Sequence, residues 1–494
     1  MQTPSIAARL DDFINPIAVK ELRQAVKGRF VAAVLILFLL AQLIIVGCVL
    51  IFNDNIGQNF QLGRGVFGGL LIVLLVTCVF FLPAFTAARF AAERSDTNVD
   101  LLFITTLRPA QIIWGKTIAA MILVFLFFSA ALPFMTVTYL LRGLDIPSTL
   151  VAVAFNLLLA TICIQVSILV GALPGSLLAR GFFFLVGLGC LICIFVAGIV
   201  LADEFTLGMG VTTWSFWGPA ISTVFLMLLG TGLMTMLSVA LVSPPSANRA
   251  LPLRIYLLFV WAATAILAAI WYLVEGDREF WEAWLVMMTL LFSACMLFAV
   301  SERHHPGPRV RKRIPRRLPL RILAFFFYSG SAGGVCFSIL MLALTVAAYC
   351  SLAAAFPSLW YDEESFRFSV TFSLYAIAYL LSARDLKQIF FKYKPAPYTA
   401  LFAFLLAAFG AVTPMIAGFL IHANTWHRIS PLWYIGNPFA VLWSDLGVWP
   451  ECFWFSFAWA TIMFFLAIPW IVRRFREFTR LDALTLSDTE TADG

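Results

Sequence analysis

Residues 30–52 read FVAAVLILFLLAQLIIVGCVLIF, a run without a single charged side chain. An α-helix rises 1.5 Å per residue, so a run of this length crosses the roughly 30 Å hydrocarbon core of a bilayer. Within lipid the backbone must satisfy its own hydrogen bonds, and an unbroken apolar run without alternation predicts a helix rather than a barrel strand. The run follows a charged segment, so we interpret it as a retained transmembrane helix and not as a cleaved signal peptide.

Eleven further runs of similar character follow along the chain. They lie at 66–88, 117–141, 149–173, 180–201, 214–242, 254–274, 281–300, 333–356, 367–383, 398–421 and 452–472. The stretch 322–356 is longer than one span needs, so its start is expected to form an interfacial helix that leads into the ninth span. The sequence therefore predicts an all-α polytopic membrane protein with about twelve transmembrane helices.

The bulk composition agrees with lipid as the main solvent. Of the 494 residues, 62% are hydrophobic and only 12% are charged, whereas soluble domains average about 45–50% apolar and about 25% charged residues. A soluble fold could not cover so much apolar surface with so few charges. The net charge of +7 is explained by membrane topology, so we expect no nucleic-acid partner.

The basic residues separate sharply between the two predicted sides of the membrane. With the N-terminus placed in the cytoplasm, only five of the 33 Lys and Arg residues lie outside: Arg64, Arg142, Arg278, Arg367 and Arg428. This asymmetry follows the positive-inside rule and predicts that both termini are cytoplasmic. The tract Arg309 to Arg321, RVRKRIPRRLPLR, is interpreted as a topology anchor at anionic lipid headgroups.

The predicted spans divide the chain into five segments. They are a cytoplasmic amphipathic segment (1–29), a six-span unit (30–242), a cytoplasmic linker (243–253), a second six-span unit (254–472) and a cytoplasmic tail (473–494). No loop is long enough to fold alone. The longest outside loop, 422–451, is rich in Trp, Pro and Tyr, so it is expected to lie on the membrane surface.

Groups that could carry chemistry are scarce. The centres of the predicted spans hold almost no ionisable side chains, which counts against a proton-coupled carrier. The four histidines lie in loops, and the pair His422 and His427 has no acidic partner at metal spacing, so we predict neither a metal site nor a catalytic set. The stretch 110–117, AQIIWGKT, lacks the first glycine of a phosphate-binding P-loop.

Small and polar residues within the spans have packing as their default role. Gln42, Asn156 and Gln165 are expected to form hydrogen bonds between helices. Two glycine pairs, Gly65 with Gly69 and Gly330 with Gly334, have the spacing of close helix contacts.

The segment before the first span predicts a short amphipathic helix. Asn15 suits the N-cap position and Pro16 suits the first helical position. An apolar face would hold Ile14, Ala18, Leu22, Ala25 and Val26, and the opposite face would hold Lys20, Arg23, Gln24 and Lys27. Glu21 is the exception, because it falls on the apolar side.

The loop between the second and third spans is the other informative cytoplasmic feature. It runs from Glu93 to Pro109, has mixed charges at its front, and then carries an apolar core, 99–104. An apolar patch exposed to the cytosol suggests a docking surface. The alternative is a helical extension of the second span that packs on its neighbours.

Together these two segments resemble the type-2 permeases of ATP-binding-cassette (ABC) transporters. Members of that family begin with a phrase such as NPIxxKEL(R/Q) on an elbow helix, which stands here as Asn15-Pro16-Ile17-Ala18-Val19-Lys20-Glu21-Leu22-Arg23. Their coupling phrase, ER…GTLELLLxTPLS…I..GK, is matched here by Glu93-Arg94, Asp100-Leu101-Leu102, Thr105-Thr106-Leu107, Ile112 and Gly115-Lys116. The family's Gly-Thr is replaced by Thr97-Asn98 and its Thr-Pro by Thr105-Thr106. The resemblance covers residues 11–242.

The resemblance implies a permease subunit of an ABC exporter in the inner membrane that does no ATP chemistry and binds no cofactor itself. ATP and Mg²⁺ would be bound by a separate ABC ATPase subunit, docked on a coupling helix at 93–108. The implied docking residues are Glu93, Arg94, Asp100, Leu101, Leu102, Thr105 and Lys116. The implied elbow residues are Asn15, Pro16, Lys20, Glu21 and Arg23. Membrane lipids and a second permease copy or paralogue are further expected partners.

The sequence leaves other interpretations open. The second half, 254–472, is either a diverged permease unit or an accessory domain. A stand-alone secondary transporter would have two six-span repeats with broken helices or ionisable groups near the bilayer centre. A membrane-embedded enzyme acting on lipids would need clustered polar residues at one membrane face. A permease-derived scaffold that no longer transports is the last alternative.

Overall fold

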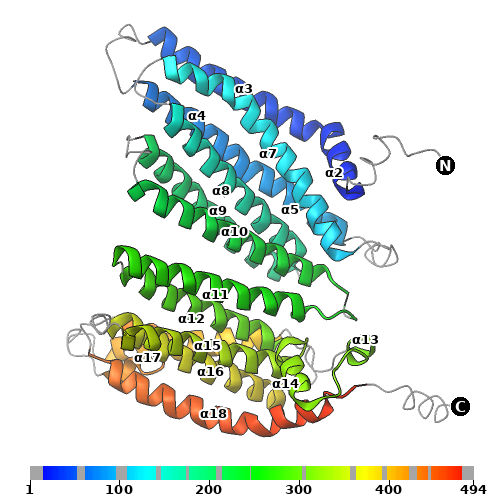
Figure 1. The fold of residues 1–494 in the computed structure, drawn as a ribbon, viewed down its shortest axis with the longest axis vertical. Helices are drawn as coiled ribbons and strands as arrows, with labels where there is room; N and C mark the ends of the chain where they lie inside the picture. The colour runs from blue at the N-terminus through cyan, green and yellow to red at the C-terminus, as the bar shows by residue number, and fades with distance from the viewer. Residues whose placement is uncertain are drawn as a thin grey trace, which may run out of the picture. The chain divides into compact units, whose positions relative to one another are not determined.

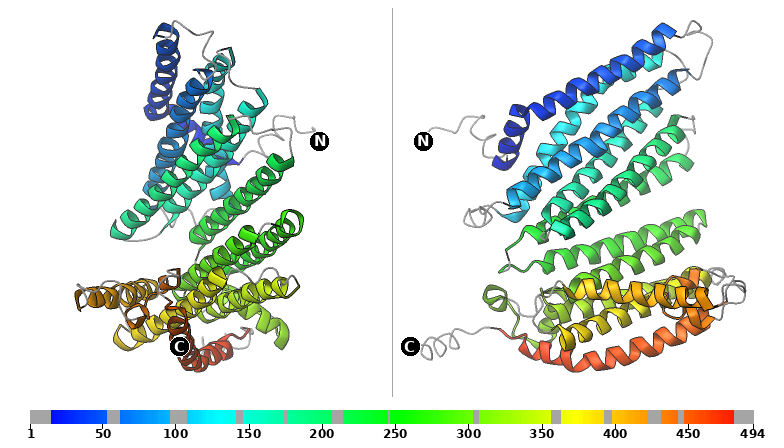
Figure 2. Two further views of the ribbon diagram at one scale, coloured as in Figure 1. Left: turned by 90° about the vertical axis from the view of Figure 1, so that its left-hand side faces the viewer. Right: turned by 180° about the vertical axis from the view of Figure 1, so that it is seen from behind.

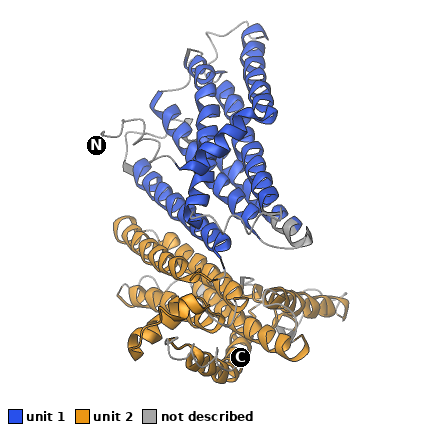
Figure 3. Ribbon diagram, turned by 90° about the vertical axis from the view of Figure 1, so that its right-hand side faces the viewer, with its two compact units in different colours: residues 1–244 blue, residues 245–494 orange. Residues whose placement is uncertain are grey.

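The structure is a computed structural model of the chain. It describes residues 15–52, 62–95, 108–140, 146–173, 177–206, 214–244, 246–276, 278–302, 307–355, 363–391, 398–421, 431–442 and 447–480. The chain forms two compact units, 1–244 and 245–494, shown in separate colours in Figure 3.

Unit 1 (1–244) is a bundle of long helices, preceded by one short helix (Figure 1). Its elements are α2 Pro16–Lys27, α3 Arg29–Phe52, α4 Leu62–Val76, the π-helix η1 Thr77–Phe81, α5 Leu82–Ser95, α7 Pro109–Leu140, α8 Ile146–Ala172, α9 Leu177–Thr206 and α10 Trp214–Val242. The elements α4, η1 and α5 form one continuous span. The chain turns at Gly28, so α2 points away from α3 and lies beside the start of α7 (Figures 1 and 2).

Unit 2 (245–494) is also helical but contains more short elements. Its elements are α11 Ala250–Glu275, α12 Arg278–Val300, α13 Pro308–Arg311, α14 Leu318–Phe327, α15 Ser331–Ala355, α16 Glu363–Phe390, α17 Tyr398–Ile421, the 3₁₀-helices η4 Pro431–Tyr434 and η5 Ala440–Leu442, and α18 Trp449–Glu477. Two helix pairs dominate the packing, α12 with α15 and α16 with α18.

The predicted fold class is confirmed. The described residues contain twelve helices that are long and apolar enough to cross a membrane, and they contain no strand. Most of these helices expose large apolar side chains on their outer faces, for example Leu37, Ile44 and Leu43 on α3. Such surfaces are matched to lipid tails and would be unstable in water. The chain is therefore a multi-pass membrane protein with a transporter-like architecture.

Several helices are longer than predicted. The third span was expected at 117–141, but α7 begins at Pro109, because proline fits the first helical turn and the early turns of α7 pack against α2. The tenth span was expected at 367–383, whereas α16 covers Glu363–Phe390. The helix α11 begins at Ala250, inside the segment predicted as a linker. The extensions of α16 contain charged residues, so a hydropathy pattern does not detect them.

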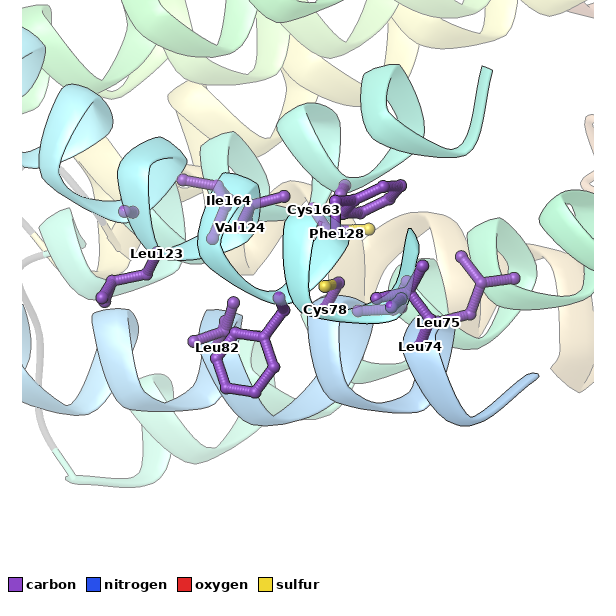
Figure 4. Close-up of a cluster of buried hydrophobic side chains, with 14 of the residues drawn as sticks. Leu74, Leu75, Cys78, Leu82, Leu123, Val124, Phe128, Cys163 and Ile164 are labelled. Atoms are coloured by element: carbon purple, nitrogen blue, oxygen red, sulfur yellow. The ribbon is translucent and has the colours of Figure 1, made fainter. Parts of the chain in front are cut away.

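The core of unit 1 lies where the second span, α4–η1–α5, meets α7 and α8. Figure 4 shows Leu74, Cys78 and Leu82 of the span directed toward Val124 and Phe128 of α7 and toward Cys163 of α8. Cys78 and Cys163 are fully buried. Leucine and phenylalanine side chains surround both cysteines, so the two thiols act as packing groups.

The segment 431–442 corrects one expectation for unit 2. The sequence placed the outer loop on the membrane surface, but this part of it packs into the unit against α16 and α17. The Tyr379 hydroxyl donates to the carbonyl oxygen of Gly436 at 2.6 Å, and the Tyr375 hydroxyl donates to the carbonyl of Ile435. Lipid tails cannot donate hydrogen bonds to backbone carbonyls, but these two hydroxyls can. The non-helical chain at Gly436 can therefore lie beside Gly410, in the middle of α17. Residues 422–430 and 443–446 lie outside the described residues.

Candidate functional site

The helix α2 is fixed at its first residue to the start of α7. Asn15 is the N-cap, and its side-chain oxygen accepts a hydrogen bond from the Ile17 backbone N–H at 3.0 Å. The other end of the same amide, Nδ2, donates to the carbonyl oxygen of Gln111 in α7 at 2.7 Å. A single side chain therefore caps one helix and attaches it to a second helix.

A glycine in α7 allows the two helices to approach closely. A Cβ atom on Gly115 would lie 2.8 Å from Cβ of Ile17 and 3.0 Å from Nδ2 of Asn15. Real Cβ atoms do not approach other heavy atoms so closely. Glycine at this position therefore determines how tightly α2 packs, as small residues do elsewhere at helix contacts in membranes.

Next to this contact, Lys116 holds two carboxylates from two different helices. Its Nζ lies 2.5 Å from Oε1 of Glu21 in α2 and 2.6 Å from Oε2 of Glu93 in α5. The lysine side chain is only 5% exposed, and its ammonium lies 4.9 Å from the centre of the Phe90 ring. A buried ammonium with two carboxylates and an aromatic face is well compensated.

Two further cations complete the network. Lys20 Nζ lies 3.4 Å from Oε1 of Glu93, and Arg89 Nη2 lies 3.6 Å from Oε2 of Glu21. Arg89 also donates to the side-chain oxygen of Gln24 in α2. Each carboxylate therefore contacts two cations. We call these five residues, Glu21, Glu93, Lys116, Lys20 and Arg89, the elbow cluster.

The elbow cluster joins α2, α5 and α7 at one end of unit 1. The helix α5 ends at Ser95, two residues after Glu93, and α7 begins at Pro109, seven residues before Lys116. The predicted docking residues Asp100, Leu101, Leu102 and Thr105 lie outside the described residues. Arg94 is part of α5.

The remaining predicted elbow residues have simpler surroundings. Pro16 is exposed at the first position of α2 and Arg23 is exposed on its polar face. Of the residues predicted on the apolar side, Ala18, Glu21 and Ala25 are buried, whereas Val26 is 74% exposed. The face that packs against the bundle is therefore Ala18, Glu21 and Ala25, since the Lys116 ammonium offers Glu21 a buried partner.

Sequence reasoning missed three members of this site. Arg89, Phe90 and Gln111 lie in parts of α5 and α7 that were interpreted as span or loop without a role. One signal was present in the sequence: Glu21 stands on the apolar side of an amphipathic helix. A charge at such a position predicts a buried partner of opposite sign.

Unit 2 contains its own ion pair, formed by a buried arginine and a partly buried glutamate. Arg254 of α11 binds both carboxylate oxygens of Glu302, each at 2.9 Å. Its other terminal nitrogen donates to the carbonyl oxygens of Phe326 at 3.0 Å and Tyr328 at 2.6 Å. Glu302 also accepts from the backbone N–H of Gly330 at 2.8 Å. We call this the Arg254 clamp, since it joins the start of α11, the residues after α12 and the α14–α15 connection.

Neither cluster has the composition of a metal site. Among the described residues, no group of three or more His, Cys, Asp or Glu side chains could hold a metal ion. The elbow cluster contains two carboxylates, but the three cations neutralise them. The cluster therefore holds helices together by ion pairs.

Comparisons with family models, curated proteins and solved structures give no match to this chain. The geometry of the elbow cluster and the sequence phrases therefore carry the functional proposal.

Proposed function

We propose that this chain is the membrane-spanning permease subunit of an ATP-driven ABC exporter in the inner membrane, with both termini in the cytoplasm. Its helices would form the translocation path, and the segment 93–108 would dock a separate ATPase subunit. ATP and Mg²⁺ would be bound and hydrolysed by that partner, so the chain itself acts as a transport subunit and not as an enzyme.

One observation supports this proposal most directly. The two family-like phrases lie far apart in the sequence, yet Asn15 contacts Gln111, Ile17 contacts Gly115, and Lys116 bridges Glu21 and Glu93. The resemblance was identified from residue types and order alone. The physical meeting of both phrases is what a coupling device requires.

The elbow cluster gives a mechanical route for such coupling. A force applied to the segment 96–107 would reach α5 through Glu93 and α7 through Lys116. Because Glu21 binds the same ammonium, α2 would move with them. These three elements would therefore respond as one body, and α5 is the last part of the continuous span α4–η1–α5.

The test is affinity purification of the tagged full chain in mild detergent from its native host, followed by mass spectrometry. The test variant carries Leu101→Asp with Leu102→Asp, and the matched control carries Leu101→Met with Leu102→Met. We expect a P-loop ATPase to co-purify with the wild type and with the Met control, and to be lost from the Asp variant. The Asp substitutions add two charges to an apolar contact, whereas Met keeps its volume.

The opposite result has a defined meaning. If no ATPase accompanies a wild-type chain that elutes as a single folded species, the docking proposal fails. A stand-alone secondary transporter or a non-transporting scaffold would then be the better description. Transport assays in vesicles without any ATPase would separate those two.

A further inference from the structure

The tract 307–328 of unit 2 folds into a defined surface. It contains seven Arg and Lys residues and no acidic residue. Val310 and Ile314 are buried, and Ile314 packs with Phe325 and with Phe478 beyond the end of α18. The Tyr328 hydroxyl donates to the carbonyl of Arg313 at 3.3 Å, which fixes the turn between α13 and α14.

Two of the cations are used inside the protein. Arg321 donates to the carbonyl oxygen of Phe475 at 2.8 Å and lies 4.8 Å from the centre of that ring. Arg311 donates to the carbonyl oxygen of Thr479 at 3.4 Å. Both bonds satisfy carbonyls at the C-terminal end of α18, where cations are favoured by the helix dipole. They hold the tract against α18.

The other five cations are exposed: Arg316, which makes an interaction of its own, and the four residues Arg309, Lys312, Arg313 and Arg317. These four are followed directly by exposed apolar side chains of α14: Leu318, Leu320, Ile322 and Leu323. We call these eight residues the basic platform. Its apolar part stands next to the start of α15, one of the candidate membrane spans, at the end of unit 2 where α18 ends (Figure 1).

In the basic platform, exposed cations are followed along the chain by exposed apolar side chains. This arrangement fits a ligand that has both a negative charge and an apolar part. A run of exposed leucine and isoleucine beside a membrane span is stable in contact with acyl chains, and a neighbouring group of cations then lies at the level of the headgroups. Clusters of four or more Lys and Arg at this position attract anionic lipids. An acidic protein surface would satisfy the cations but would leave the leucines against polar groups.

We propose that the basic platform is a binding site for an anionic phospholipid, with the phosphate held by Arg309, Lys312, Arg313 and Arg317 and the acyl chains against α14. The sequence alone predicted only an electrostatic anchor. The site is independent of the ATPase proposal, because it lies in unit 2 and uses none of the docking residues.

The experiment is a native mass spectrometry titration of the purified full chain in dodecyl maltoside with phosphatidylglycerol and, separately, with phosphatidylcholine. The platform variant carries Arg309→Gln, Lys312→Gln, Arg313→Gln and Arg317→Gln. The control variant removes the same charge from exposed residues of unit 1, with Arg23→Gln, Lys27→Gln, Arg29→Gln and Arg108→Gln.

We expect phosphatidylglycerol to bind the wild type more tightly than phosphatidylcholine, and the platform variant to lose ~tenfold or more of that affinity, since each cation near a lipid surface contributes a severalfold factor. The control variant should lose about threefold at most, and phosphatidylcholine binding should change in neither. A salt titration of the wild type, which needs no variant, should weaken phosphatidylglycerol binding alone.

Three results would overturn the proposal. The first is equal affinity of the wild type for both lipids at low and high salt. The second is an equal loss in the platform and control variants, which would mean that overall charge and not a built site attracts the lipid. The third is unchanged lipid binding in a platform variant that instead loses a co-purifying acidic protein.

Discussion

The elbow cluster in unit 1 and the Arg254 clamp in unit 2 both bury a cation at a junction of helices, but they are built differently. Arg254 has one carboxylate partner and two backbone carbonyls, and every one of these contacts is 3.0 Å or shorter. Lys116 binds two side-chain carboxylates instead, and it shares them with Lys20 and Arg89 at 3.4 and 3.6 Å.

The difference separates a fixed joint from an adjustable one. Backbone carbonyls cannot move without unwinding a helix or a turn, so the Arg254 clamp locks its three segments together. The elbow cluster consists of side chains with redundant partners, and its outer member Lys20 is 57% exposed. Such a network can exchange partners while it keeps its charges compensated. That property is what the proposed coupling to an ATPase would need.

The largest effect should come from removing the cation of the clamp. Arg254→Met leaves two part-buried carbonyls without their donor and leaves Glu302, whose side chain is 31% exposed, with only the Gly330 N–H. Breaking a buried pair typically costs about 3–5 kcal/mol, and we expect about 3 kcal/mol here. We expect the largest fall in the thermal midpoint of the GFP-tagged full chain, measured by fluorescence size-exclusion in detergent. Arg108→Met, at an exposed arginine, is the control and should leave the midpoint unchanged. A similar small change in both variants would refute the clamp.

An intermediate effect is expected for the cation of the elbow cluster. Lys116→Met leaves Glu21 and Glu93 with one cation each, so the cost should be about 2 kcal/mol, less than for a fully unpaired buried charge. Adding Glu21→Gln should restore part of the midpoint, because it removes the surplus charge. The contrast between the two junctions would break down if Lys116→Met were as destabilising as Arg254→Met, or if the second substitution made the chain less stable.

The smallest effect concerns close packing rather than charge. Gly115→Ala brings a Cβ against Ile17 and should cost about 1–2 kcal/mol by overpacking. Ile17→Ala in the same chain should relieve the clash and recover stability. Gly65→Ala is the matched control: a Cβ on Gly65 would meet no atom within 4 Å, and alanine favours a helix. An equal response of the thermal midpoint at both glycines would show that α2 does not pack on α7 as described.

The membrane-spanning character could be predicted from sequence, but the packing within the spans only in part. Gln42 donates to the Leu70 carbonyl at 3.1 Å, and Gln165 donates to the Thr117 hydroxyl at 3.0 Å, so both join two helices as predicted. Asn156 differs, because its amide donates to the Ala152 carbonyl of its own helix at 2.8 Å. A single amide cannot reveal from its sequence position whether a neighbouring helix or its own turn offers the nearer oxygen.

The two glycine pairs also show that close helix packing could be predicted from the sequence only in part. Gly334 packs tightly, since a Cβ there would lie 2.5 Å from Nη2 of Arg254, but no atom lies within 4 Å of such a position on Gly330. A Cβ on Gly69 would touch Ile45 only at 3.9 Å, and Gly65 faces open space. Small-residue spacing indicates where helices could approach, and the partner helix decides whether they do.

The sequence by itself determined the twelve spans and the all-helical class. These follow from the free energy of moving each residue from water to lipid, which is nearly additive along the chain. Only the tertiary structure decided that Lys116 bridges Glu21, 95 positions away, and Glu93, 23 positions away. Such a contact depends on how several helices pack in three dimensions, and no local pattern in the chain encodes that distance.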